Sequence, residues 1–391
     1  MPTFRENLRL LPRPAWILFG GTFINRFGTF VMPFLVIYMT RLGYTPAQAG
    51  IAVSAYGAGH LIASMVGGDL ADRIGRRYTI AISMFGSAAS MVALSQAEGY
   101  FAILACTFVV GVFGELYRPA AQALISDLVA PEQRVTAFGI YRMAINLGFA
   151  FGPATAGFLA DNSFLYLFLG DAVTSFAYGI VALFALPHGL RGQTKDERAT
   201  EGIRVALRDP LFVRFLLATL CVTWIEFQIH STLPLHIAAQ GFGTQTYGLL
   251  MSLNGAMIVI FELGIIAWTQ RMPQQPMIAI GYGLSGIGFA LTGLAYGIPA
   301  LTATVVIWTI GEMIYAPVAG AFVAGIAPER YRGRYMGLWV MSWSAGMLLG
   351  PALGTLLYQS NEPLYWSTIA AMGCVGAALA LSKPAQPLTT P

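Results

Sequence analysis

Residues 68–77 read Gly68-Asp69-Leu70-Ala71-Asp72-Arg73-Ile74-Gly75-Arg76-Arg77, a charged segment at the junction of two apolar stretches. Both stretches, 47–70 and 78–97, are long enough to cross a bilayer as helices, which takes roughly 20 apolar residues. The segment is therefore predicted to be a tight turn between two spans. Its glycines let helix ends approach. Asp72 can face the positive end of a neighbouring helix, and the arginines can pair with acids such as Asp127.

The apolar pattern continues along the whole chain. Of its 391 residues, 56% are hydrophobic and 10% are charged, against about 25% charged in an average soluble domain. This excludes a cytosolic enzyme and a disordered chain. The predicted fold class is an all-α membrane protein of twelve transmembrane helices, at 14–40, 47–70, 78–97, 100–128, 132–160, 163–187, 211–238, 245–270, 276–297, 299–327, 331–358 and 362–382.

Basic residues are concentrated in alternate loops. With the N-terminus inside, eighteen of them fall in cytoplasmic segments and one, Arg41, falls in an outer loop. The positive-inside rule then predicts a multi-pass protein of the cell (inner) membrane with both termini in the cytoplasm. The net charge of +4 lies almost wholly in loops, so it indicates membrane orientation and not nucleic-acid binding.

The two halves of the chain resemble each other. Gly114-Glu115 recurs 197 residues later as Gly311-Glu312, and Gly152-Pro153 recurs 198 residues later as Gly350-Pro351. Such a duplication predicts two pseudo-symmetric six-helix bundles with a cavity between them. The predicted domains are an N-terminal bundle at 1–187, a polar cytoplasmic linker at 188–210 that is partly helical along 201–207, and a C-terminal bundle at 211–391.

The segment 68–77 resembles motif A of the major facilitator superfamily, G-x-L-A-D-R-x-G-R-R, and follows the second of twelve predicted spans, as in that family. The resemblance covers the whole chain and implies transport by alternating access. The gating residues expected from it and from the charge pattern are Gly68, Asp72, Arg73, Gly75, Arg76 and Asp127. This cluster is expected to hold the outward-facing state shut on the cytoplasmic side, with Asp72 near the start of the eleventh span.

A second segment, 148–157, resembles motif C of the drug/proton antiporter families, G-x-x-x-G-P-x-x-G-G. The matching residues are Gly148, Gly152, Pro153 and Gly157, while Ala156 replaces one glycine. The alternative is a kinked packing helix, because small residues at four-residue spacing let helices approach closely and the second half has the same glycines. The arginine of motif B is missing, and Thr107 stands in its place.

Ionisable side chains inside membrane spans are costly unless paired or hydrated, so they are candidate functional groups. Those in the first half are Arg26, Glu115, Arg118, Arg142 and Asp171, and those in the second half are Glu226, His230, Glu262 and Glu312. The cavity is thus predicted to have a basic wall and an acidic wall. Of these residues, the candidate substrate and proton-binding groups are Glu226, Glu312, Arg26, Arg142, Asp171 and His230.

Spacing predicts which charges pair. Glu115 and Arg118 are three residues apart on one helix, so they are expected to form a structural network with Arg142. Asp171 is expected to neutralise Arg26 or Arg142. Glu226 and Glu312 lie near the membrane midplane with no basic residue of their own half at that depth. Each is predicted to exchange a proton for a cation. The alternative is a carboxyl satisfied by neighbouring hydroxyls or by the backbone.

The sequence predicts a secondary active transporter and not an enzyme. It contains no Walker A motif, no residue pattern typical of a catalytic triad and no Cys or His pair at metal-ligand spacing. Neither a cofactor nor a metal is therefore expected. The predicted function is proton-coupled efflux (antiport) of lipophilic, cationic drugs by a monomer in the lipid bilayer, with a small molecule and protons as partners. The alternative is a proton-coupled symporter or exporter of an amphiphilic or anionic metabolite bound by arginines.

Overall fold

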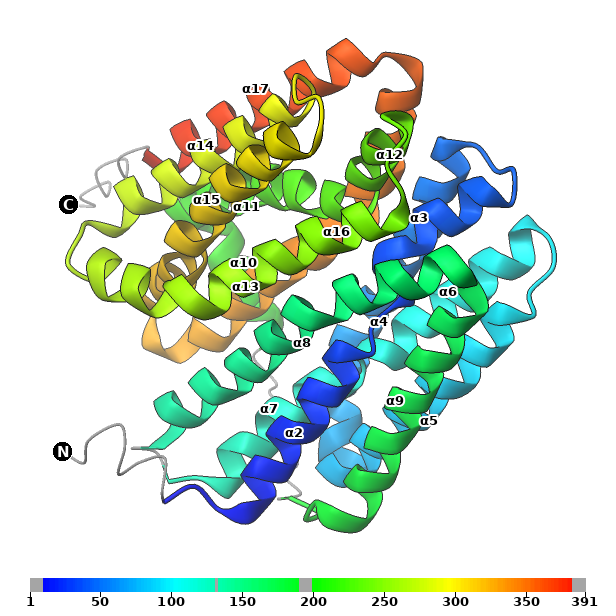
Figure 1. Ribbon diagram of the computed structural model, residues 1–391. Coiled ribbons are helices and arrows are strands. Elements are labelled where there is room, and N and C mark those ends of the chain that lie inside the picture. Colours follow the sequence, from blue (N-terminus) through cyan, green and yellow to red (C-terminus); the bar gives the residue numbers. More distant parts are fainter. Residues whose placement is uncertain (1–9, 131–132, 190–198, 382–391) are drawn as a thin grey trace.

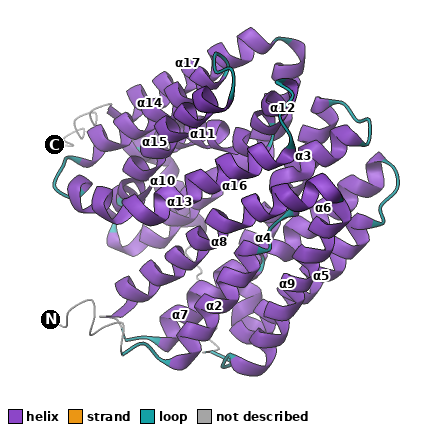
Figure 2. Ribbon diagram, viewed as in Figure 1, coloured by secondary structure: helices purple, strands orange, loops and turns teal. Residues whose placement is uncertain are grey.

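The computed structural model describes residues 10–130, 133–189 and 199–381, and in these ranges every regular element is a helix (Figures 1 and 2). The extreme termini and linker residues 190–198, on which parts of the orientation and linker predictions fall, lie outside the described residues. Within the linker, α10 (Ala199–Arg208) confirms the helix predicted at 201–207.

Twelve spans run through the described part of the chain, as predicted. They are α2 (Arg13–Phe27) with α3 (Val31–Arg41), α4 (Pro46–Ile74), α5 (Arg76–Ser95), α6 (Tyr100–Glu115) with α7 (Tyr117–Leu128), α8 (Arg134–Asn162), α9 (Phe164–Ala185), α11 (Pro210–Glu226) with α12 (Thr232–Ala239), α13 (Thr244–Thr269), α14 (Gln274–Thr292), α15 (Ile298–Ile326), α16 (Arg332–Ser360) and α17 (Glu362–Leu381). Eleven of them are long and apolar enough to cross a membrane. The remaining span, α14, has a less apolar sequence, and it packs against α15 and α17.

The spans form two six-helix bundles, which Figure 1 shows as a half coloured blue to green and a half coloured green to red. The main contacts between the bundles are those of α8 with α13 and of α4 with α16. The sequence limits proposed for the two domains stay predictions.

The glycines repeated in the two halves pack equivalent helices together. A Cβ at Gly148 of α8 would lie 2.7 Å from the backbone nitrogen of Phe27, and one at Gly152 would lie 2.6 Å from the Phe27 carbonyl oxygen. In the second half, a Cβ at Gly350 of α16 would lie 3.4 Å from the carbonyl oxygen of Trp224. The fifth span therefore packs on the first as the eleventh packs on the seventh, which supports the packing interpretation of these glycines.

The rest of the motif C segment joins the two bundles. A Cβ at Gly157 would lie 2.8 Å from the carbonyl oxygen of Thr244, so α8 and α13 touch closely there. Pro153 lies inside α8, and the next backbone N–H, of Ala154, donates to Ser252 Oγ of α13 at 2.9 Å. This segment is therefore a contact between the two halves. Its small residues let the helices approach, and the Ala154 N–H bonds to the other helix.

The bundles meet on one side of the membrane and separate on the other. On the side opposite the described ends of the chain, the Ala352 N–H of α16 donates to Ser54 Oγ of α4 at 3.0 Å. Toward the side where α2 starts and α17 ends (Figure 1), no described atom lies within 4 Å of a Cβ placed at Gly68, Gly139 or Gly337. We call the first the outer side and the second the terminal side, which is the predicted cytoplasmic side. The structure is therefore open toward the terminal side.

Three spans are broken at the depth of the predicted charges. The first is interrupted at 28–30 and the seventh between Glu226 and Thr232. In the fourth the interruption is confined to Leu116, which keeps helical backbone angles and its hydrogen bond to the Val112 carbonyl. A proline lies in the first turn after each break, at Pro33, Pro119 and Pro234. Proline lacks a backbone N–H and its ring clashes with the carbonyl four residues earlier, so it is accommodated where a new helix begins. The predicted spans are present, and these interruptions within them were not predicted.

Candidate functional site

A cavity of about 330 Å³ lies between the bundles. Both halves contribute ionisable side chains to it, namely Arg26, His60, Glu115, Arg118, Glu226, His230 and Glu312. The broken spans carry most of them, because Arg26 precedes the first break, Glu115 and Arg118 flank the second, and Glu226 precedes the third. The remaining predicted binding residues, Arg142 and Asp171, are not among the residues that line it, although Arg142 is an electrostatic neighbour of Glu312.

The basic wall of the cavity is built around one buried carboxylate. Glu115 is 5% exposed and accepts hydrogen bonds from both Nη groups of Arg26 at 3.2 Å and from the Tyr56 hydroxyl at 3.0 Å. It also forms an ion pair with Arg118, whose Nε lies 2.9 Å from Oε2. The Glu115–Arg118 pair was predicted. Two guanidinium groups share a single carboxylate, so this wall keeps an excess of one positive charge.

Arg142 does not belong to the Glu115 cluster, which corrects the sequence prediction. Its guanidinium forms an ion pair with Glu262 of α13, in the other bundle. The place expected for it is taken by Arg26, because the first span lies beside the fourth and the Arg26 Nε also donates to the Tyr117 hydroxyl at 3.0 Å. The spacing of residues along the sequence does not indicate which side chains of different helices meet.

The Arg142–Glu262 pair is unequally exposed, and this predicts unequal costs of substitution. The Arg142 side chain is 43% exposed and that of Glu262 is 11% exposed. Arg142→Gln leaves a carboxylate with little water access and is expected to lower the free energy of unfolding by about 1–3 kcal/mol. Glu262→Gln leaves an arginine that water reaches and is expected to cost under about 1 kcal/mol. Thermal unfolding in detergent measures both, and equal losses would contradict this assignment.

Asp171 does not neutralise an arginine, which corrects a second prediction. Its buried carboxyl lies against the backbone N–H groups of Phe30 and Val31, at the start of α3. None of the ion pairs found among the described residues involves Asp171. Its Oδ1 accepts a hydrogen bond from the Ser175 hydroxyl at 3.5 Å. The carboxyl lies beside the first turn of α3, whose N-cap makes no side-chain hydrogen bond. The break in the first span creates this position.

The acidic wall consists of Glu226 and Glu312. Both face the cavity, as predicted from their depth, with Glu226 buried and Glu312 partly buried. Glu312 accepts a hydrogen bond from Asn254 Nδ2 at 3.0 Å. The Glu226 Oε1 atom is buried without a hydrogen-bond partner among the described residues, although the Ser285 and Tyr315 hydroxyls lie near this carboxyl. No ion pair joins either acid to a basic side chain described here.

The internal repeat explains why the acid of one wall is paired with arginines and the acids of the other wall are not. Glu312 is the counterpart of Glu115, but the position 197 residues after Arg26 is Thr223 and the one after Arg118 is Tyr315. Thr223 also occupies the packing position of Arg26, because a Cβ at Gly346 would lie 3.1 Å from the Thr223 carbonyl carbon. The second half has therefore kept the acid and lost both arginines.

His230 lies at the break in the seventh span. Its ring packs against Phe149 of the other half, with 6.3 Å between ring centres. Its Nδ1 atom is buried and has no hydrogen-bond partner in the part of the chain that the structure describes. A proton-binding role for His230 stays a prediction.

Two neutral residues of the site were missed by the sequence analysis. Tyr56 donates to Glu115 and Asn254 donates to Glu312. Uncharged hydrogen-bonding residues are common in membrane helices, so nothing in their type or spacing marks them. The breaks themselves had a signal, since Pro33, Pro119 and Pro234 each lie inside a long apolar stretch.

The predicted gating residues gather on the terminal side. Arg76 pairs with Asp72 at 3.0 Å and with Asp127 at 3.1 Å, so the predicted partner Asp127 is confirmed. Gly75 has a φ of +99°, which glycine adopts at low cost at the turn between α4 and α5. Arg73 pairs with Asp69 at 2.9 Å and stays on the surface.

The expected position of Asp72 near the start of the eleventh span is not met in this structure. Its ion-pair partner is Arg76, one turn further along the chain. The reason is the separation of the bundles on this side, where no described atom comes within 4 Å of a Cβ at Gly68 or Gly337. The gating role itself stays a prediction for the outward-facing state.

Asp72→Asn tests that role. Losing the charge is expected to remove about 1 kcal/mol of helix-dipole stabilisation from the outward-facing state, a roughly fivefold shift of the population toward the inward-facing state. Distances between spin labels on the terminal ends of α4 and α16 measure the shift. Asp69→Asn is the matched control, since Asp69 pairs with exposed Arg73. An unchanged distance distribution in Asp72→Asn would refute the gating role.

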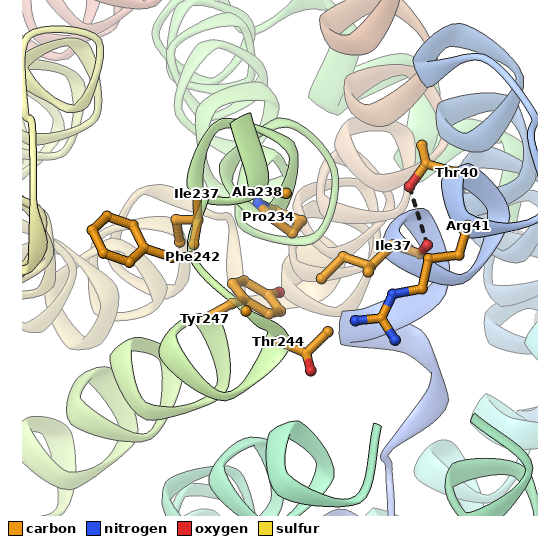
Figure 3. Close-up of a pocket in the computed structure, with 10 residues that line it drawn as sticks. Ile37, Thr40, Arg41, Pro234, Ile237, Ala238, Phe242, Thr244 and Tyr247 are labelled. Carbon is orange, nitrogen blue, oxygen red and sulfur yellow. Dashed lines mark hydrogen bonds between the residues drawn. The ribbon is translucent and has the colours of Figure 1, made fainter. Parts of the chain in front are cut away.

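A second pocket, of about 190 Å³, lies at the outer side between α3, α12 and α13 (Figure 3). Figure 3 shows the Arg41 side chain reaching toward Thr244. Arg41 lies 3.9 Å from Asp161, which also bonds to the Thr244 hydroxyl. The predicted acids of the site are absent from the lining of this pocket, so it belongs to the closed outer side and not to the central site.

Comparison with known proteins bears on the whole chain. Residues 18–267 and 229–387 match the family model of the Major Facilitator Superfamily. An uncharacterized MFS-type transporter of Bacillus subtilis is 28% identical over 90% of this chain and 88% of its own length. A Na(+), Li(+), K(+)/H(+) antiporter of Planococcus maritimus is 21% identical, covering 85% and 87%. The multidrug resistance protein MdtH of Klebsiella pneumoniae is 22% identical, covering 88% and 87%.

Solved structures share the fold. A POT family transporter in complex with a thioalcohol-conjugated peptide superposes with a TM-score of 0.80 at 19% identity, covering 95% of each chain. A D-xylose-proton symporter superposes with a TM-score of 0.76 at 17% identity, covering 94% of this chain and 96% of its own. At these identities the likeness concerns the arrangement of helices and not the substrate.

Proposed function

The chain belongs to the Major Facilitator Superfamily, and we propose that it is a proton-coupled antiporter that exports lipophilic, cationic compounds. It is a multi-pass membrane transporter and not an enzyme. The proposal places it in the cell (inner) membrane as a monomer with both termini in the cytoplasm. The observation that carries it is the pair of acids that face the cavity, buried Glu226 and partly buried Glu312, neither of which forms an ion pair among the described residues.

Two uncompensated acids give a physical route to coupling. A carboxylate in a poorly hydrated cavity is costly unless a proton or another cation neutralises it. Glu226 and Glu312 are electrostatic neighbours, so their negative charges also repel each other. A proton and a cationic substrate therefore compete for the same pair. Competition at one site, with access alternating between the two sides, exchanges one for the other.

The lining of the cavity suits a lipophilic molecule. Phe149, Phe227, Trp343 and Met347 line it beside the charged groups. Aromatic faces attract cations in addition to burying apolar surface. A multidrug resistance protein and a cation/H(+) antiporter among the relatives are compatible with this proposal.

The second candidate is a proton-coupled transporter of an amphiphilic or anionic metabolite. The observation favouring it is Arg118, which lines the cavity, is 38% exposed and uses its Nε for Glu115. Its outer guanidinium nitrogens are free of partners in the described chain and could receive an anion.

A transport panel separates the two candidates. The purified protein is placed in liposomes that are acidic inside, and uptake of a lipophilic cation, a neutral analogue and an anionic analogue is followed. Antiport of cations predicts accumulation of the cation that depends on the pH gradient and is absent from empty liposomes. Gradient-dependent movement of the anion alone would favour the second candidate and overturn the first.

A further inference from the structure

The central cavity has two poles of opposite charge. At one pole, Arg26 and Arg118 share the single carboxylate of Glu115. At the other, Glu226 and Glu312 form no ion pair among the described residues, and the nearest basic influence on Glu312 is Arg142, which is itself paired with Glu262. The first pole therefore has one unbalanced positive charge and the second has up to two negative charges. All five side chains line the same cavity.

The positive pole has unused hydrogen-bond donors. A guanidinium carries five N–H donors, and the Nε of Arg118 lies 2.9 Å from Glu115 Oε2 in an ion pair. In the described chain no further partner contacts the Nη groups of Arg118, whose side chain is 38% exposed. Arg26, by contrast, is 12% exposed and bonds through all three nitrogens to Glu115 and Tyr117. Arg118 is therefore the arginine available to a ligand.

A substrate with only a positive charge would leave the Nη groups of Arg118 without a hydrogen-bond acceptor. Its apolar body would displace water from the Arg118 Nη groups and offer them no acceptor, and an unsatisfied charged donor is expensive. A substrate carboxylate, phosphonate or similar anion would accept two parallel hydrogen bonds from the fork of the guanidinium. The apolar side chains between the poles, such as Phe149 and Met347, would contact the body of the same molecule.

We propose that the preferred substrates are zwitterionic, with a cationic group held by Glu226 and Glu312, an apolar body, and an anionic group held by Arg118. This rests on the proposed function, because the cationic end occupies the acids that exchange protons. Arg118 is then a specificity-determining residue. It distinguishes amphoteric compounds from simple lipophilic amines.

Four related ligands test the proposal on the unmodified protein. They are 4-(4-aminobutyl)benzoic acid, its methyl ester, its N-acetyl derivative and the N-acetyl methyl ester, and their affinities are measured by calorimetry in detergent. The zwitterion is expected to bind about tenfold or more tightly than either singly blocked form, since each blocked end loses a charge-assisted hydrogen bond. If the ester binds as tightly as the zwitterion, this inference is wrong while cation antiport stands. If the N-acetyl form binds most tightly, both are wrong.

A variant assigns the anionic pole to its residue. Arg118→Gln is expected to lower the ratio of the ester Kd to the zwitterion Kd from about ten toward one. Arg134→Gln is the control, because Arg134 is an exposed arginine at the start of α8 that donates only to the Ser126 carbonyl at 3.3 Å, and it should keep the wild-type ratio. A wild-type ratio in Arg118→Gln would exclude Arg118 as the anion-binding group. The ligand series stays decisive if that variant does not fold.

Discussion

The double variant Glu226→Gln/Glu312→Gln is expected to lose proton-driven transport of lipophilic cations and to keep its fold. An amide has nearly the shape of the carboxyl but binds neither a proton nor a cation by charge. Each lost charge-assisted contact costs about 1.5–3 kcal/mol, so uptake driven by a pH gradient should fall by about 100-fold or more. Folding should survive, because a neutral amide in this cavity avoids the desolvation cost of the charge.

The control for this experiment is Glu262→Gln. Glu262 is also a largely buried acid of the second half, but it pairs with Arg142 and lies outside the lining of the cavity. It should keep most of the transport rate. Transport of a cation by the double variant at the wild-type rate would exclude Glu226 and Glu312 from the coupling mechanism.

The second large effect is expected from Glu115→Gln. This carboxylate is the shared partner of Arg26 and Arg118 and also accepts the Tyr56 hydroxyl. The amide would leave Arg26, 12% exposed, without a countercharge in a poorly hydrated site. Removing one partner of a buried ion pair costs about 3–5 kcal/mol, so the free energy of unfolding should fall by that amount.

Thermal and denaturant unfolding of the purified variant measure this loss. Glu98→Gln is the matched control, because Glu98 is an exposed acid and its replacement should change stability by less than about 0.5 kcal/mol. If Glu115→Gln unfolds like the control, the cluster is not a structural element of the first half. The acid would then have to be assigned to binding.

The sequence was sufficient for the fold because its strongest signals are local. Long apolar stretches predict spans, and the segment 68–77 fixes the turn between the second and third. The repeat of Gly114-Glu115 at Gly311-Glu312 places Glu115 and Glu312 at equivalent depths. Depth along a helix follows from its rise per residue, so the prediction that Glu226 and Glu312 face one cavity needed no knowledge of tertiary contacts.

Pairings between helices were not predictable in the same way. The Arg142–Glu262 ion pair joins residues 120 positions apart in different bundles, and Arg26 reaches Glu115 across 89 positions. Which helices lie side by side depends on packing over their whole length, and glycines such as Gly148 set that packing. The break before Val31 places the backbone of Phe30 and Val31 beside Asp171, which no pattern of charges indicates.

The direction of proton movement tests the central claim most directly. Liposomes containing the protein and a trapped pH indicator are prepared at equal pH on both sides, with the membrane potential held at zero by potassium and valinomycin. A permanently charged lipophilic quaternary ammonium compound is then added outside. Antiport through Glu226 and Glu312 predicts that the interior becomes more alkaline in the wild type and not in the Glu226→Gln/Glu312→Gln variant. Acidification of the interior, or no pH change in the wild type, would contradict the account.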